Sequence, residues 1–207
     1  MVCRVVDGTL PRTITLPPRI GKLISKIIKP KLVNIIVNWI DKKDAKIFRN
    51  AKDSQYKFSL IYRGIGDQIN DRTIKDECTG HGQVASLVLI KVQGSQKIFG
   101  GYSPIGFKFR PISFNDKNLY DHCTTDSFIF SFENDEDTRN MKISRVVNYR
   151  HAILEHYSTG FNFGHGSLCM RDRDLHVNNN YGNYENNLNT KIVYTIELIE
   201  IYIVVKL

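Results

Sequence analysis

Short β-prone runs separated by turn-forming residues occupy most of the chain after residue 51, and this pattern limits the fold more than any other feature. The runs are rich in β-branched and aromatic residues and are bounded by Gly, Asn and Asp. They cover residues 58–62, 84–92, 97–102, 126–132, 166–170 and 192–205. Few helical segments separate them, so repeated βαβ units are disfavoured. The sequence therefore predicts an antiparallel α+β or β-sandwich arrangement.

The chain before residue 51 has a different pattern. Residues 1–18 contain three prolines and little periodicity, which predicts a tail or an extended lead-in. In residues 19–50 apolar residues recur three or four positions apart on both sides of Pro30, which predicts a basic helical lead-in of two pieces. Residues 51–207 would then form the sandwich domain.

Two helices are predicted among the strands. Residues 71–78 are expected to form a short helix capped by Asn70 or Asp71. A second helix is expected near residues 149–156. Both would flank the sheets.

The positive charge of the chain is confined to its beginning. The 207 residues carry a formal net charge of +8, and residues 1–50 hold 11 Lys/Arg against 3 Asp/Glu, whereas the remainder holds 18 of each. A nucleic-acid-binding face usually carries a basic cluster with aromatic neighbours, which residues 51–207 lack, so we expect no nucleic-acid partner. A tether from the basic N-terminus to a membrane or a nucleic acid is the alternative.

The cysteines and the apolar runs predict a compartment. Cys3, Cys78, Cys123 and Cys169 are too scattered for a disulfide framework, and no apolar signal segment opens the chain. The longest apolar run, residues 32–40, is shorter than the roughly 20 residues that span a bilayer. A soluble, cytoplasmic protein is expected.

Catalytic and metal-binding motifs are weak. Ser167 follows the glycines of Gly164-His165-Gly166 instead of lying between two glycines as in a nucleophile elbow. The Cys/His pairs at 78/81, 122/123 and 165/169 lack the spacing of structural zinc sites. We expect no cofactor and no metal. The alternative is a hydrolase-like or metal-dependent enzyme with several candidate groups around a cavity. These groups are His122, His151, His165, Cys169 and Glu200.

Glu200 is unusual because it lies inside the closing run 192–205, both alternating faces of which are mostly apolar. A carboxylate in such a strand needs hydrogen-bond donors or a cation. We predict that Glu200 is a buried structural carboxylate rather than a general base. Its expected partners are backbone N–H groups, a hydroxyl, or a basic side chain from a neighbouring loop.

Four segments occur in an order that resembles the TLDc family, most closely its fungal type. They are Tyr62-Arg63-Gly64, a run ending in Gly-Gly-Tyr at 100–102, Asp-Ser-Phe-Ile-Phe-Ser-Phe at 126–132, and Phe-Gly-His-Gly-Ser-Leu at 163–168. The resemblance covers about residues 36–204, and Glu200 is similar to a glutamate of the family's final strand. The motif residues expected to be structural are Gly100, Gly101, Tyr102, Asp126, Ser127, Phe128, Phe130, Gly164, Gly166, Leu168 and Glu200.

The resemblance implies a sandwich of two antiparallel sheets flanked by short helices, with no established enzymatic activity. It also implies a link to oxidative-stress resistance and a protein partner, with vacuolar proton-pump subunits as the candidate. We therefore expect a non-catalytic protein-interaction module, in which Gly100-Gly101 and residues 164–166 are turns that use positive φ angles. Two positions depart from the family pattern: Phe107 replaces a usual tryptophan, and Gln68 replaces a usual glycine.

Overall fold

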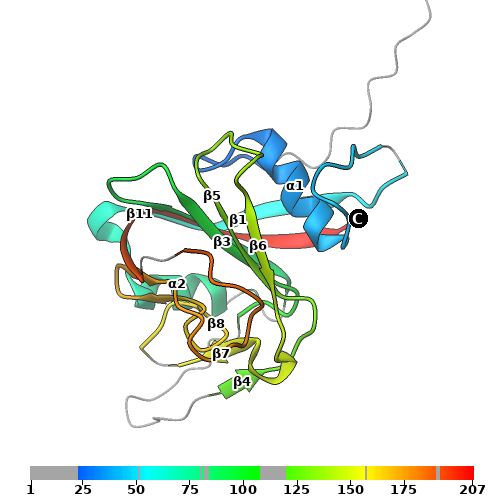
Figure 1. The fold of residues 1–207 in the computed structure, drawn as a ribbon. Coiled ribbons are helices and arrows are strands. Elements are labelled where there is room, and N and C mark those ends of the chain that lie inside the picture. The colour runs from blue at the N-terminus through cyan, green and yellow to red at the C-terminus, as the bar shows by residue number, and fades with distance from the viewer. Residues whose placement is uncertain are drawn as a thin grey trace, which may run out of the picture.

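Two antiparallel β-sheets packed face to face form the body of the protein (Figure 1). The computed structural model describes residues 23–50, 52–79, 81, 84–107, 120–156, 158–189 and 192–207. The tail predicted for residues 1–18 lies outside the described residues. Within them, the α+β sandwich flanked by short helices is confirmed.

The main sheet has the strand order β1-β11-β2-β3-β5-β6. The small sheet has the order β4-β7-β8-β9-β10 and ends on the first residues of β11. The main-sheet strands are β1 (Tyr56–Ile65), β2 (Ser86–Val92), β3 (Ile98–Ser103), β5 (Phe128–Phe132), β6 (Lys142–Arg145) and β11 (Val193–Lys206). The small-sheet strands are β4 (Tyr120–His122), β7 (Ile153–Glu155), β8 (Asn162–Phe163), β9 (Leu168–Arg171) and β10 (Asp174–His176).

Each of the six predicted runs overlaps a strand, namely β1, β2, β3, β5, β9 or β11. Sequence analysis missed β4, β6, β7, β8 and β10, which are two to four residues long. Segments of this length are too short for alternation of apolar and polar residues to be recognised.

Strand β11 belongs to both sheets. Its first residues, 193–195, pair with β10, and residues 198–206 pair with β1. A bulge at Glu197 separates the two parts, because the register against β2 shifts between Ile196 and Leu198. Regular alternation places Ile196, Leu198 and Glu200 on one face. The bulge corrects this expectation: Ile196 faces the space between the sheets, whereas Leu198 and Tyr202 face outward.

Apolar layers cover both faces of the main sheet. In β2, Val88 and Ile90 point toward the small sheet, and Leu87 and Leu89 point to the opposite side, because successive strand side chains alternate. All four are fully buried. The inner layer lies between the two sheets, and the outer layer lies under the N-terminal segment. Burial on both faces explains why β2 is almost continuously apolar.

Residues 23–40 supply the cover of the outer layer (Figure 1). The helix predicted before Pro30 is wrong for residues 23–29, which are not helical. The Ser25 hydroxyl instead accepts hydrogen bonds from the N–H groups of Ile27 (2.9 Å) and Ile28 (3.1 Å), a local turn that competes with a helix. Pro30 begins helix α1 (Pro30–Ile40), where its missing N–H has no cost, so it starts a helix rather than separating two.

Helix α1 docks through aromatic contacts. The Trp39 ring lies 6.2, 5.7 and 5.7 Å from the rings of Phe128, Phe130 and Phe132, which project from β5 on the same face. Trp39 and the three phenylalanines are buried. Strand β5 and the lead-in are therefore one packing unit.

The two other predicted helices have different outcomes. Helix α2 (Asp71–Thr79) is confirmed, with the Asn70 side-chain carbonyl accepting from the Thr73 N–H at 2.9 Å. The helix predicted at 149–156 is wrong. That segment contains a single 3₁₀ turn, η2 (Tyr149–His151), followed by β7, because it pairs with β4 and β8. A further 3₁₀ turn, η1 (Gly66–Gln68), follows β1.

Candidate functional site

The Gly100-Gly101 motif lies inside β3 and is not a turn, which corrects the expectation of positive φ angles there. A Cβ on Gly100 would lie 2.3 Å from the Phe130 ring and 2.6 Å from the Val88 carbonyl oxygen. A Cβ on Gly101 would lie 2.5 Å from the Phe163 ring, on the opposite face. The pair therefore lets one aromatic ring approach the sheet from each side.

The turn between β8 and β9 does use positive φ angles, as predicted for Gly164 and Gly166. Gly164, His165 and Gly166 have φ angles of +61°, +59° and +106°. The Asn162 side-chain carbonyl accepts from the Gly166 N–H at 2.8 Å and fixes the turn. The non-glycine residue in the left-handed region, His165, is thereby directed to one end of the small sheet.

Ser127 connects the β5 motif to the small sheet. Its hydroxyl donates to the Tyr102 carbonyl at 2.9 Å and lies 2.8 Å from the Tyr184 hydroxyl, which donates to the Ala152 carbonyl at 3.0 Å. Burial raises the pKa of Tyr184, so the phenol remains a donor. This is a satisfied polar link within the sandwich.

Most of the remaining motif residues serve packing. Tyr102, Phe128 and Phe130 lie in the outer layer, and Leu168 lies in the inner layer. Asp126 differs, since it is exposed and forms an ion pair of 2.7 Å with Lys42, just after α1. Hydrogen bonding to Lys42 lowers the pKa of Asp126.

Glu200 is completely buried and has the kinds of partner that the sequence predicts. Oε1 accepts from the Lys26 N–H (3.0 Å) and from Nε and Nη2 of Arg63 (both 2.8 Å). Oε2 accepts from the Ser25 hydroxyl (2.5 Å) and the Tyr202 hydroxyl (2.9 Å). The carboxylate therefore joins the lead-in to β1 and β11. This geometry gives it a positioning role for residues 24–28.

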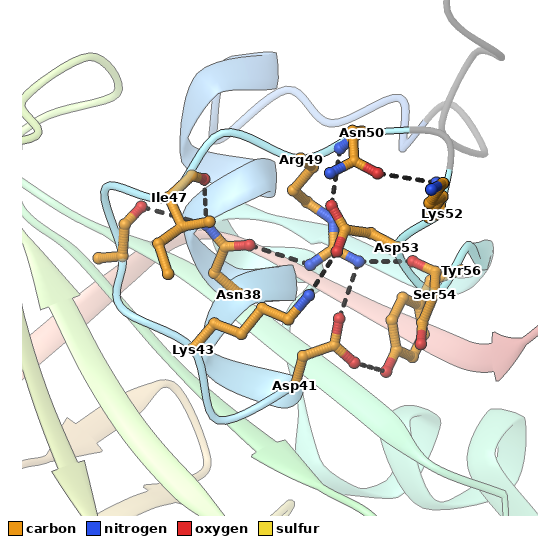
Figure 2. Close-up of polar contacts among 11 residues, drawn as sticks. Asn38, Asp41, Lys43, Ile47, Arg49, Asn50, Lys52, Asp53, Ser54 and Tyr56 are labelled. Carbon is orange, nitrogen blue, oxygen red and sulfur yellow. Dashed lines mark hydrogen bonds and ion pairs between the residues drawn. The ribbon is translucent and has the colours of Figure 1, made fainter.

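Sequence reasoning missed a second buried ionic network, beside the end of α1 (Figure 2). Arg49 forms an ion pair with Asp41 (2.8 Å) and donates to the Asn38 side chain (2.9 Å) and the Ser54 carbonyl (2.5 Å). The Tyr56 hydroxyl donates to Asp41 at 2.6 Å. Asn38 inside the apolar run of α1 was the available signal, since a buried amide needs partners.

Asp121, His151 and His165 meet at the end of the small sheet. Nε2 of His165 lies 2.6 Å from Oδ1 of Asp121, and Nδ1 of His151 lies 2.9 Å from Oδ2. The two imidazole rings cross at 87° with centroids 5.0 Å apart. Asp121 comes from β4, His151 from η2 and His165 from the β8–β9 turn. Sequence reasoning named both histidines but missed the carboxylate between them.

His122, the neighbour of Asp121, points the other way. Its Nε2 lies 3.0 Å from a carboxylate oxygen of the buried Glu155. Adjacent strand residues face opposite sides, so this pair is separate from the Asp121 group. Among the described residues, the grouped ligand set is Asp121, His151 and His165, and the Cys/His pairs considered from the sequence do not form one.

The candidate nucleophiles are buried. Ser167 is enclosed, and its hydroxyl lies within donating distance of the Gly164 carbonyl (3.2 Å) and the Asn179 side-chain carbonyl (2.9 Å). Burial raises the pKa of the Cys78 thiol and of the Cys169 thiol to about 12. A thiol needs to ionise to attack, so neither cysteine is an activated nucleophile.

One pocket of about 260 Å³ opens beside β10 and β11. It is lined by Lys142, Val177, Asn178, Asn180, Asn187, Asn189 and Ile192. The candidate catalytic groups named from the sequence do not contribute to this lining. Asparagine amides offer hydrogen bonds but no general base.

Exposed apolar side chains gather near the Asp121 group. Val147, Tyr149 and Tyr181 are 62%, 47% and 73% exposed. The Val147 N–H donates to the Asn183 carbonyl, and the Tyr181 ring lies 5.9 Å from the His165 ring, so these segments are neighbours. We call the surface formed by Val147, Tyr149 and Tyr181 the tyrosine face.

The protein is a β-sandwich, and most of its motif residues are buried contacts within or between the two sheets. The family model of the TLDc domain matches residues 22–197. The chain therefore belongs to the TLDc domain family. The match includes the lead-in that covers the main sheet and ends just before Glu200. No curated protein gives a significant match. Among the described residues, no helix is long and apolar enough to cross a membrane.

Proposed function

We propose that this TLDc domain is a non-catalytic protein-interaction module and that the tyrosine face is its binding surface. The observation that carries the proposal is the gathering of three exposed residues, Val147, Tyr149 and Tyr181, on neighbouring segments at one end of the small sheet. Tyrosine is enriched at protein interfaces because it combines a large apolar body with a hydroxyl group.

The placement of the motif residues supports a binding role over a catalytic one. Gly100, Gly101, Ser127 and Leu168 make packing or structural contacts inside the sandwich. Glu200 is saturated by donors and lies away from solvent. A general base needs access to a substrate proton, which this environment does not provide.

The family resemblance supplies the candidate partner, a subunit of the vacuolar proton pump, in a cytoplasmic setting linked to oxidative-stress resistance. The test is binding of the full chain to purified vacuolar proton pump. We expect the double variant Tyr149→Ser/Tyr181→Ser to lose binding, because aromatic anchors carry much of an interface's free energy. Phe48→Ser is the matched control. Phe48 is 95% exposed and lies in the loop after α1. Helix α1 itself is on the opposite side of the molecule from β4 (Figure 1).

Equal binding by the double variant and the parent would show that the tyrosine face is not the interface. Absence of binding by the parent would remove the pump as partner. A loss of binding by the double variant is interpretable only if the variant is folded, so its thermal unfolding is measured alongside. Loss of binding by Phe48→Ser alone would move the interface to the lead-in.

The tether hypothesis has weaker support. Leu23, Ile27 and Ile28, the apolar residues that a membrane-bound helix would offer, are buried on the main sheet. Lys26, Lys31 and Lys46 are exposed. Their replacement by Gln would abolish salt-sensitive binding to anionic vesicles if these lysines acted as a tether, since electrostatic binding follows the charge.

A further inference from the structure

We propose that Asp121, His151 and His165 bind a Zn²⁺ ion at the end of the small sheet, beside the tyrosine face. One ligand atom from each residue lies within 4.8 Å of the other two. Two imidazoles and one carboxylate form a borderline ligand set that suits Zn²⁺ and disfavours Mg²⁺ and Ca²⁺, which prefer oxygen ligands.

Asp121 lies somewhat closer to each histidine than neighbouring ligands lie to each other in an occupied zinc site. The carboxylate oxygens of Asp121 lie 2.6 Å from His165 and 2.9 Å from His151. In a tetrahedral site with ligands about 2.0–2.1 Å from the metal, neighbouring ligand atoms are about 3.3 Å apart. An outward movement of less than about 1 Å would therefore accommodate the ion.

His151 offers a specific reason to expect a ligand. Its Nδ1 is buried and makes no hydrogen bond of acceptable geometry, although Asp121 lies close to it. A buried polar atom without a well-directed partner is uncommon in folded proteins. A metal ion placed between the three side chains would use the lone pair of this nitrogen.

The backbone positions the ligands without the metal. His165 adopts a φ angle of +59°, which residues other than glycine normally avoid. It lies between two glycines that also have positive φ angles. Backbone strain of this kind is unfavourable and concentrates at functional sites. The pairing of β4 with β7 brings Asp121 beside the end of η2. Three separate chain segments therefore converge before any ion arrives.

The surroundings are compatible with a cation. The nearest basic residue in sequence, Arg150, turns toward Tyr149, with its guanidinium carbon 5.9 Å from that ring. The side chains of His151, Asp121 and His165 are 41%, 29% and 23% exposed. An ion held by three ligands at this depth keeps at least one position open to water or to a group from a bound partner.

The test is calorimetric titration of the chelator-treated full chain with Zn²⁺, with Mg²⁺ as the comparison ion. We expect one equivalent of Zn²⁺ with micromolar affinity or better and no Mg²⁺ binding. Co²⁺, which absorbs strongly in tetrahedral sites, provides a spectroscopic readout on the same protein. Neither measurement requires a protein partner, so failure here and failure of the proposed function are distinguishable.

The key variant is His165→Gly, which removes a ligand and relieves the positive φ angle, so the fold is retained. It should weaken Zn²⁺ binding by more than the roughly 10- to 100-fold caused by loss of an outer-shell partner. His151→Ala should do the same. His81→Ala removes an exposed histidine outside the group and should bind as the parent. Cys123→Ser tests the exposed thiol.

Zn²⁺ binding that survives both His165→Gly and His151→Ala would overturn the proposal, as would binding lost in Cys123→Ser. Absence of a Zn²⁺ equivalent in the parent would identify Asp121 as only a hydrogen-bond acceptor between two histidines.

Discussion

At the scale of single residues, Glu200 connects segments that are far apart in the chain. Replacement by Ala would leave the Arg63 guanidinium, the Lys26 N–H and the Ser25 hydroxyl without their acceptor, while the Tyr202 hydroxyl keeps the Ile24 carbonyl as acceptor. Breaking a buried ion pair in this way costs about 3–5 kcal/mol. We expect a loss of this size in chemical denaturation, together with faster hydrogen exchange in residues 24–28.

Two further variants separate charge from geometry. Glu200→Gln should cost about half as much, because an amide oxygen can still accept from Arg63 while its NH₂ faces Ser25 and Tyr202. Glu197→Ala is the control on the same strand, since its ion pair with Lys91 is partly exposed and worth at most about 1 kcal/mol. Parent-like stability of Glu200→Ala would refute the positioning role.

Gly101 and Phe163 occupy one space. Gly101→Ala places a Cβ 2.5 Å from the Phe163 ring, and overpacking of this kind costs about 1–3 kcal/mol. Phe163→Leu alone also destabilises by opening a cavity. The double variant should be less destabilised than the sum, with a coupling of about 1 kcal/mol in a double-mutant cycle. Additive effects would show that the two side chains do not compete for the space.

Asp71, at the start of α2, provides a pH-dependent prediction. Burial raises the pKa of its carboxyl to about 6, and one of its oxygens has no partner. The native state therefore holds this proton up to about pH 6, whereas the unfolded state releases it near pH 4, so stability falls as the pH rises through that window. Asp71→Asn removes the penalty above pH 6.

The expected gain for Asp71→Asn at pH 7.5 is about 1 kcal/mol after allowance for solvent screening, or about 2–4 °C in Tm. At pH 4 the gain should disappear, because the parent carboxyl is then protonated. A gain that is equal at both pH values would mean that ionisation of Asp71 is not its source.

At the scale of elements, the lead-in is part of the sandwich core. Residues 23–40 cover Leu87, Leu89, Phe128 and Phe130 on the main sheet. We expect a chain that starts at residue 51 to expose this apolar face, and therefore to bind hydrophobic dyes and aggregate. Large exposed apolar patches promote association with other molecules. A chain that starts at residue 23 keeps every contact described above.

The two truncated chains can be compared by circular dichroism and light scattering. A soluble, cooperatively unfolding chain that starts at residue 51 would contradict the role assigned to the lead-in. It would instead support the domain boundary predicted there from the change of periodicity, which so far stays a prediction.

The long elements were predictable from the sequence, and the short ones were not. β2 and β11 carry enough consecutive apolar residues to be recognised, whereas β7 and β8 form only because β4 and β9 lie beside them. The need of Glu200 for donors followed from its apolar strand. That Ser25 and Arg63 provide them depends on packing between distant segments, which single-sequence patterns do not contain.

The same reasoning applies to the candidate sites. His151 and His165 were recognised as chemically capable residues, but their common partner Asp121 lies on a strand too short to predict. The Gly100-Gly101 motif was recognised, but it was predicted to be a turn. Glycine is required there because the Phe130 and Phe163 rings, which come from other strands, lie against the backbone. The sequence shows which side chains are chemically capable, but not which of them lie close together in the fold.

At the scale of the whole molecule, the sharing of β11 between the sheets determines when the domain can fold. β11 is the last strand, yet it pairs with β1, β2 and β10 and supplies the carboxylate that holds the lead-in. During synthesis β2, β3, β5 and β6 can pair with one another, but the strand that joins them to β1 and to the small sheet emerges after all of them, and such non-local pairing folds slowly. Ribosome-bound chains should therefore remain protease-sensitive until β11 has emerged, and early protection of β2 and β3 would contradict this order. We therefore expect a stop codon before residue 193 to leave no smaller folded domain, because the strand shared by both sheets would be missing.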